Sequence, residues 1–323
     1  MGWSQVLFAV AAPDRMDAAV LGKVQRLTAA LGAELELFHC VDGSLAAQPQ
    51  RLGSPEFEQA VHELIEQRER QLEQQAQSLR RPGLQVRSSV RWDHPVHEGI
   101  VRQVLSHRPD LLIVQPSRHH GPWRLGYADY KMIEICPCPL LLIKSTRPYT
   151  ECRLIAAVDP MHEHDKPAAL DDAILDAATI LSNALSGKLL MFHARAARPR
   201  ITPLLRHEAV EFRGPAESAQ GDGVEARITE LAQRHGIARV DVELVEGNAA
   251  EALPFLARRE SADIVAMGAV SRSLLKRIFI GHTAETLLDG LDCDMLVVKP
   301  PGFRSKVSLH TELSAPARRV KRA

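Results

Sequence analysis

The sequence predicts an α/β protein made of two tandem, doubly wound, five-stranded parallel sheets. Short apolar runs alternate with segments of helical periodicity along the chain, and this order occurs twice with specific residues in register. Aromatic residues are only 4% of the 323 residues, so the core must consist of Leu, Val, Ile and Ala. Such a core suits helices packed on both faces of a buried parallel sheet, as in Rossmann and flavodoxin folds.

The first half begins with a strand over 6–12 and a helix whose apolar positions keep helical spacing until Gly32. Ser54 and Pro55 then open a second helix, because a hydroxyl caps free amides and proline fits the first turn. That helix is expected to run to about Arg81. The other expected elements are strands Glu36–Val41, Val86–Trp92, Asp110–Val114 and Leu140–Lys144, a helix Pro95–His107, and a short helix through Ile133.

The second half repeats this order. Its expected strands are Leu154–Val158, Leu189–His193, Val240–Val245, Asp263–Met267 and Met295–Lys299. Three pairs of matching segments lie 154, 153 and 155 residues apart: Phe38–Cys40 with Phe192–Ala194, Asp110–Val114 with Asp263–Met267, and Cys138–Lys144 with Cys293–Lys299. Offsets this constant indicate a duplication. They predict domains at 1–148 and 151–303, followed by a basic, flexible tail at 304–323.

Composition excludes several classes of protein. Lys plus Arg and Asp plus Glu balance at 40 each, whereas a nucleic-acid-binding domain is usually basic. No segment reaches the roughly 18 consecutive apolar residues that a membrane span needs. Five cysteines without framework spacing are typical of a reduced compartment. We therefore expect a cytoplasmic protein that binds neither membrane nor nucleic acid, although the cations of the tail could make weak contacts with nucleic acid.

The topology indicates where a ligand binds. Parallel sheets of this kind bind ligands beyond the carboxyl ends of the strands, where strand order reverses. In the second half this place is the loop that follows Met267–Gly268 and leads through Ser271 to Gly281, His282 and Thr283, which open a helix. Glycines allow close backbone approach, and free amides at a helix start attract phosphate.

This loop resembles that of ATP-binding members of the universal stress protein family, and tandem members of that family resemble nearly the whole chain. The family pattern is Gly, two residues, Gly, nine residues, then Gly with a small polar residue. Here Ser271 replaces the second glycine, and His282 stands where Ser, Thr or Asn is usual. The resemblance implies that ATP or AMP binds in the second domain, with Asp159 on the ribose or adenine edge and the Ala194 backbone on adenine.

Simpler interpretations of the same residues remain open. An Asp before a Pro commonly starts a turn, and a glycine at a strand end is common as well. A serine at the place of Ser271 would be strained by roughly 1 kcal/mol or more if that position needs positive φ. Arg272, Lys276 and Arg277 lie nearby and could contact phosphate or simply be solvated.

The first half lacks these features. Gln115–Pro116 stands where Gly268–Ala269 stands, Ala12 replaces Asp159, and bulky Tyr127 replaces His282. Because proline has no amide proton, this loop also loses a phosphate donor. We therefore expect at most one nucleotide site per chain, and an unknown ligand or protein partner for the first domain.

Other chemistry-bearing residues favour structural roles. Histidines at 94, 97, 119, 120, 162 and 164 form no three-ligand set in the sequence, so no metal site is predicted. Cys138 and Cys293 recur at one position, which indicates packing rather than redox chemistry. His39 and His193 also recur and are expected to be hydrogen-bonded at strand ends, and no catalytic residue is predicted.

These observations predict a stress-response or regulatory binding protein. Two alternatives remain: a slow ATPase or nucleotide-transferring enzyme, for which only Lys276 and His282 are available, and a scaffold that binds no nucleotide. The family resemblance further implies that the two halves pack as a dimer-like pair with their fifth strands close together. A homodimer of whole chains is a further alternative.

Overall fold

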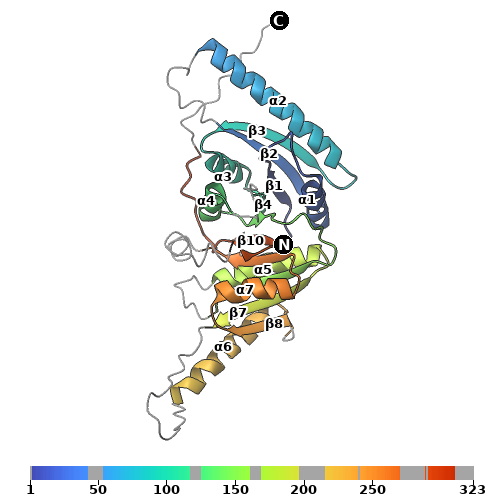
Figure 1. The fold of residues 1–323 in the computed structure, drawn as a ribbon. Coiled ribbons are helices and arrows are strands. Elements are labelled where there is room, and N and C mark those ends of the chain that lie inside the picture. The colour runs from blue at the N-terminus through green and yellow to red at the C-terminus, as the bar shows by residue number, and fades with distance from the viewer. Residues whose placement is uncertain are drawn as a thin grey trace.

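A computed structural model of the chain describes residues 2–42, 54–116, 125–160, 169–195, 215–238, 241–269, 288 and 290–309, without the side chains of 195 and 215–222. In this part of the chain, ten strands form one sheet in the order β3-β2-β1-β4-β5-β10-β9-β6-β7-β8. The predicted α/β class is confirmed, and both halves share one strand order. The two five-stranded sheets join edge to edge (Figure 1).

The described elements follow the predicted order in each half. The first half contains β1 (Gln5–Ala9), α1 (Ala18–Leu31), β2 (Glu34–Asp42), α2 (Pro55–Leu79), β3 (Val86–Asp93), α3 (Val96–His107), β4 (Leu111–Val114), α4 (Tyr127–Ile135) and β5 (Leu140–Leu142). The second half contains β6 (Arg153–Ala157), α5 (Ala169–Ala184), β7 (Lys188–Arg195), α6 (Pro215–Arg234), β8 (Val242–Glu246), α7 (Ala249–Arg259), β9 (Ile264–Gly268) and β10 (Asp294–Val298).

Local signals place the helix ends. Gly32 ends α1 with φ 64°, a left-handed conformation that glycine adopts without strain. Ser54 caps α2, its hydroxyl accepting a hydrogen bond from the Phe57 amide at 3.2 Å. Both helix ends were predicted from these residue types, and both are confirmed.

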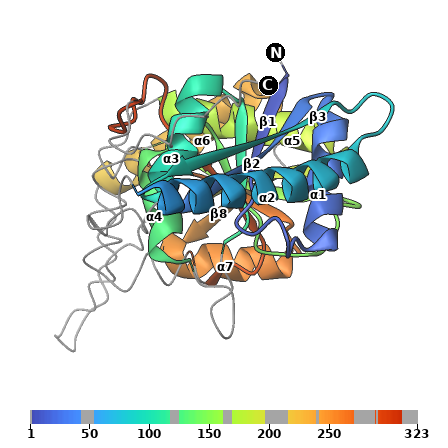
Figure 2. The ribbon, with the colours of Figure 1, turned by 90° about the horizontal axis from the view of Figure 1, so that it is seen from above.

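The strands alternate between two apolar layers, one on each face of the sheet. Val6 and Phe8 belong to the layer covered by α1, α2, α5 and α6, whereas Leu7 and Ala9 belong to the layer covered by α3, α4 and α7. Helix α2 lies at the end of the molecule beside the edge strand β3 (Figures 1 and 2). A sheet covered on both faces requires nearly continuous apolar strands, which these sequences provide.

The two halves meet where β5 and β10 pair antiparallel, Leu141 opposite Leu296. The other strand pairs in the described part of the chain are parallel. This pairing confirms that the fifth strands lie together. Beside it, the fully buried carboxylate of Asp294 accepts hydrogen bonds from the Lys144 amide at 2.9 Å and the Tyr149 hydroxyl at 2.5 Å, and it pairs with buried Lys23.

The chain returns to the first half after β10. Val307 packs against apolar residues of the layer with α3 and α4, and Arg102 Nε donates to the Ser308 carbonyl at 3.0 Å. Ser308 of the predicted tail thus contacts the first half, while the predicted domain boundaries stay predictions. None of the described helices combines the length and apolar character needed to cross a bilayer.

Candidate functional site

Three predicted site residues of the second half meet at one edge of the sheet. Strand β6 lies between β7 and β9, and Ala157 is in register with Phe192 on one side and Met267 on the other. Asp159 lies two residues after Ala157, Ala194 lies two residues after Phe192, and Met267 is itself one of the paired positions. The carboxyl ends of β6, β7 and β9 therefore bring them together, across the point where strand order reverses between β6 and β9.

The turn that carries Asp159 is held by a second carboxylate. The Asp159 amide donates to Asp171 Oδ1 at 3.0 Å, and Asp171 is buried in the first turn of α5. An acidic side chain is stabilised at this end of a helix. Sequence reasoning missed Asp171, although an acid in a first helical turn was a usable signal.

Gly268 is closely approached by a helix. A Cβ added there would lie 2.7 Å from Leu170 Cδ2 and 3.1 Å from Ile174 Cδ1 of α5. The packing of α5 on β9 therefore suffices to require glycine at this position. Close approach by a ligand, which motivated its choice from the sequence, is not needed to explain it.

Four of the predicted site residues, Ser271, Gly281, His282 and Thr283, lie outside the described residues. Leu288 and Gly290 are helical and belong to the end of the helix predicted after Thr283. The phosphate-binding role of the loop thus stays a prediction.

The repeated histidines link neighbouring strand ends. His39 Nδ1 lies 2.7 Å from the Val10 carbonyl, and His193 Nδ1 lies 3.0 Å from the Val158 carbonyl. Since a carbonyl only accepts, Nδ1 carries the proton in both rings. Burial lowers the pKa of His39, so its ring is neutral at pH 7 with Nε2 as an acceptor. Both rings are hydrogen-bonded at strand ends, as predicted, but the buried Nε2 of His193 has no partner among the described residues.

The first half places an internal carboxylate at the start of α4. The Gly126 amide donates to Asp129 Oδ2 at 2.8 Å, and Asp129 is buried. The negative charge of Asp129 therefore lies at the start of α4, where it pairs with the free Gly126 amide. The alignment of Ala12 with Asp159 is wrong by one residue: Val10 and Val158 occupy equivalent places beside Phe38 and Phe192, so Ala11 stands where Asp159 stands. Gln115 follows β4 at the neighbouring strand end.

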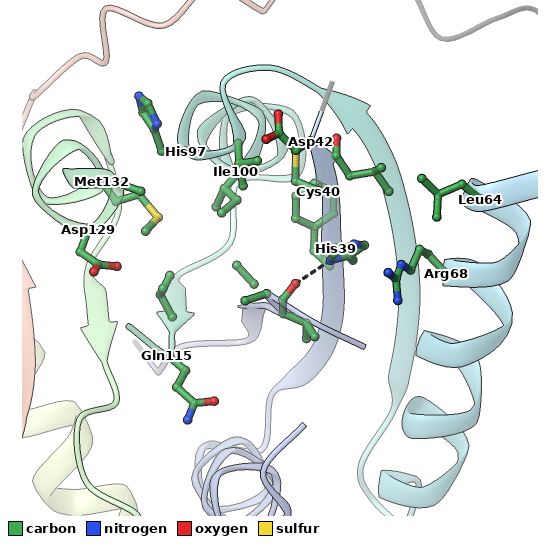
Figure 3. Close-up of a pocket in the computed structure, with 18 residues that line it drawn as sticks. His39, Cys40, Asp42, Leu64, Arg68, His97, Ile100, Gln115, Asp129 and Met132 are labelled. Atoms are coloured by element: carbon green, nitrogen blue, oxygen red, sulfur yellow. Dashed lines mark hydrogen bonds between the residues drawn. The ribbon is translucent and has the colours of Figure 1, made fainter. Parts of the chain in front are cut away.

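A cavity of about 410 Å³ opens at the carboxyl ends of the first-half strands. It extends from Met132 of α4, past Ile100 of α3, to His39 of β2 and to Leu64 and Arg68 of α2 (Figure 3). Sequence reasoning missed this cavity, because residues of α2 gave no signal of proximity to β2.

Comparison with known proteins identifies the relatives of this chain. The sequence matches the Universal stress protein family over residues 2–144 and again over residues 153–299. The chain belongs to the universal stress protein family.

This universal stress protein resembles tandem members along nearly its full length. It is 25% identical over 320 residues to Universal stress protein E of Escherichia coli K12, covering 97% of this chain and 99% of that protein. The crystal structure of a putative universal stress protein from Pseudomonas aeruginosa UCBPP-PA14 shares the fold, with a TM-score of 0.67 and 23% identity. The match covers 92% of this chain and 94% of that chain. A universal stress protein from Archaeoglobus fulgidus also shares the fold, with a TM-score of 0.56 and 12% identity. That match covers 91% of this chain and 98% of the other.

The remaining candidate residues have structural contacts in this universal stress protein. His94 Nδ1 lies 2.9 Å from Asp42 Oδ1. The His97 ring packs edge-on against the Tyr127 ring, with 5.9 Å between the two ring centres. No three His, Cys, Asp or Glu side chains converge as metal ligands within the described ranges, which omit His119, His120, His162 and His164. Burial raises the pKa of Cys293 to about 12, which supports a packing role.

Proposed function

We propose that the second domain binds one adenine nucleotide, ATP or AMP, and that the protein acts in stress response or its regulation in the cytoplasm. The observation that carries this proposal is the meeting of Asp159 with Ala194 and Met267 at the reversal point between β6 and β9. Doubly wound sheets bind their ligands at this point.

Each residue has a distinct role in this proposal. Asp159 accepts from the ribose or the adenine edge, and backbone groups of Ala194 and Met267 contact the base. Asp171 orients the turn through the Asp159 amide. Gly268, Ser271, Gly281, His282 and Thr283 form the phosphate loop, whose amides at a helix start suit phosphate.

The difference between the halves supports a single site. In the first half the Asp129 carboxylate accepts from the Gly126 amide at the start of α4, and Ala11, at the place of Asp159, has no side-chain oxygen to offer a ribose. An anionic phosphate at that helix start would face a like charge, which disfavours binding.

Calorimetric titration of the full chain with ATP and with AMP tests this function. We expect at most one site per chain. Asp159→Ala should weaken binding by roughly 1–3 kcal/mol, the range for losing a charged hydrogen-bond partner. Asp176→Ala, on the exposed side of α5, is the matched control and should leave affinity unchanged.

The phosphate loop is tested at Gly281 rather than at Gly268, because a side chain at 268 would collide with α5. Gly281→Leu should abolish binding, since its side chain would occupy the phosphate position. Ser271→Gly should leave affinity unchanged or raise it. Two equal sites, or a single site unaffected by Asp159→Ala and Gly281→Leu, would contradict the proposal. Undetectable binding would favour a scaffold, and ATP turnover would favour an enzyme.

A further inference from the structure

We propose that the first-half cavity binds an uncharged aromatic molecule whose hydroxyl group donates a hydrogen bond to His39 and accepts one from Arg68. This inference does not depend on nucleotide binding by the second domain. It assigns the first half its own class of ligand, a hydroxylated aromatic compound.

The size and walls of the cavity suit a ring compound. Its volume of about 410 Å³ lies within the range of small-molecule sites, roughly 300–1,000 Å³. Its walls are mainly aliphatic, and Phe38 and the Met132 thioether add groups that pack well against aromatic rings. The apolar part of the wall is formed by Val10, Val41, Leu64, Val96, Ile100 and Val114.

His39 gives the cavity a hydrogen-bond acceptor. The residue is 8% exposed, and Nδ1 donates to the Val10 carbonyl. Among the described residues nothing donates to Nε2, so this nitrogen presents a lone pair to the cavity. His39 Nε2 is reached by solvent, unlike the buried Nε2 of His193, so a ligand hydroxyl would replace water as its donor, whereas a ligand without a hydroxyl would displace that water and supply no donor.

Arg68 gives the cavity a hydrogen-bond donor beside that acceptor. Figure 3 shows it reaching from α2 toward the His39 ring, on the side away from Val10. Its Nη1 donates to Asp14 Oδ1 at 3.1 Å and to Gln71 Oε1 at 2.9 Å. Within the described ranges its Nε and Nη2 donate to nothing, so they remain available to a ligand oxygen. A hydroxyl group satisfies both partners at one point, because it donates and accepts.

The charges around the cavity disfavour an anion. Asp42 and Asp129 line it, and the Arg68 cation is already paired with Asp14. The Nε2 lone pair of His39 also repels a carboxylate oxygen. A neutral hydroxyl therefore fits the site better than a carboxylate or a phosphate.

Fluorescence titration of the full chain with 2-naphthol tests this inference, with naphthalene and 2-naphthoate as matched probes. We expect 2-naphthol to bind at one site, and both other probes to bind at least about tenfold more weakly, since each loses the donor to His39. Saturating AMP should leave 2-naphthol binding unchanged.

Two variants locate the site. His39→Asn keeps an N–H donor near the Val10 carbonyl but removes the Nε2 acceptor. Arg68→Met keeps the length of the side chain but removes its hydrogen-bond donors. Each should weaken 2-naphthol binding about tenfold and leave naphthalene binding unchanged. Arg68→Met changes a partly exposed side chain of α2, so it tests the site even if the change at His39 impairs folding.

Matched controls separate ligand contact from loss of structure. His193→Asn makes the same change at the repeated position, and Arg70→Met removes an exposed cation from the same helix. Both should bind 2-naphthol as the native chain does. The inference is overturned if 2-naphthol does not bind, if naphthalene binds equally well, if 2-naphthoate binds more tightly, or if His39→Asn and Arg68→Met have no effect.

Discussion

At the residue scale, burial decides the chemistry of Lys299. Only 7% of this residue is exposed, and its Nζ donates to the Glu134 carbonyl at 3.1 Å and lies 4.6 Å from the centre of the Phe303 ring. Desolvation lowers the pKa of Lys299 from 10.5 to about 8. The ammonium group is thus held where the chain leaves β10 and passes along α4.

This pKa predicts how stability depends on pH. Between about pH 8 and 10.5 the unfolded chain holds more protons at Lys299 than the folded chain does, so the contribution of this residue to stability rises with pH. We expect the stability of the native chain, relative to Lys299→Met, to increase by roughly 2–3 kcal/mol across that range. Urea unfolding of both proteins at pH 7.5 and pH 10 measures the difference.

The comparison with Lys299→Met is needed because buried thiols titrate in the opposite sense. Burial raises the pKa of Cys40 and of Cys152 to about 12, and both thiols destabilise the folded chain as pH rises above 9. These thiols are shared by both proteins and cancel in the difference. A relative stability that stays constant or falls with pH would contradict the assignment.

At the element scale, two helical glycines of the first half have opposite environments. A Cβ at Gly22 of α1 would meet nothing within 4 Å, whereas a Cβ at Gly99 of α3 would lie 2.6 Å from Cys40 Sγ and 2.8 Å from Asp93 Cβ. Gly99 therefore allows α3 to lie close to the ends of β2 and β3, and Gly22 has no such role.

The same substitution should thus have opposite effects at the two positions. Gly22→Ala should stabilise the protein by roughly 0.5–1 kcal/mol, because alanine loses less backbone freedom in a helix. Gly99→Ala should destabilise it by roughly 1–3 kcal/mol, the usual range for overpacking. Thermal unfolding followed by circular dichroism measures both, and a destabilised Gly22→Ala or a neutral Gly99→Ala would refute the packing described.

At the scale of the whole molecule, a buried ionic cluster joins the two halves beside the β5–β10 pair. The Asp294 carboxylate of the second half accepts from the Ser145 amide at 2.9 Å as well as from Lys144 and Tyr149. Lys23 of α1 pairs with Asp294 and lies 4.2 Å from the centre of the Tyr149 ring. The side chains that fix this junction thus come from both halves and from the segment between them.

Removing the carboxylate should destabilise this junction strongly. In Asp294→Ala, Lys23 keeps a buried charge without its carboxylate, and a broken buried pair typically costs about 3–5 kcal/mol. We expect a lower urea midpoint. Asp292→Ala, an exposed position two residues earlier, should change stability by less than about 0.5 kcal/mol. Equal effects of the two substitutions would show that the cluster does not hold the halves together.

The sequence by itself determined the elements of this protein and their duplication. Apolar periodicity, the Ser54 cap and the Gly32 stop act over one or two helical turns, so they can be interpreted without knowing the neighbours. The constant offset between repeats showed that both halves share one topology. It also placed Asp159, Ala194 and Met267 at strand ends, because strand ends of a parallel sheet share an edge.

Only the tertiary structure decided how distant residues meet. The packing of α5 on β9 explains Gly268, and the path of α2 brings Arg68 to His39. The antiparallel β5–β10 pair places Asp294 beside Lys23. These contacts depend on how the helices and the two halves of the sheet pack against each other. No local sequence pattern encodes them, because each helix or strand would form in the same way whether or not the contact is made.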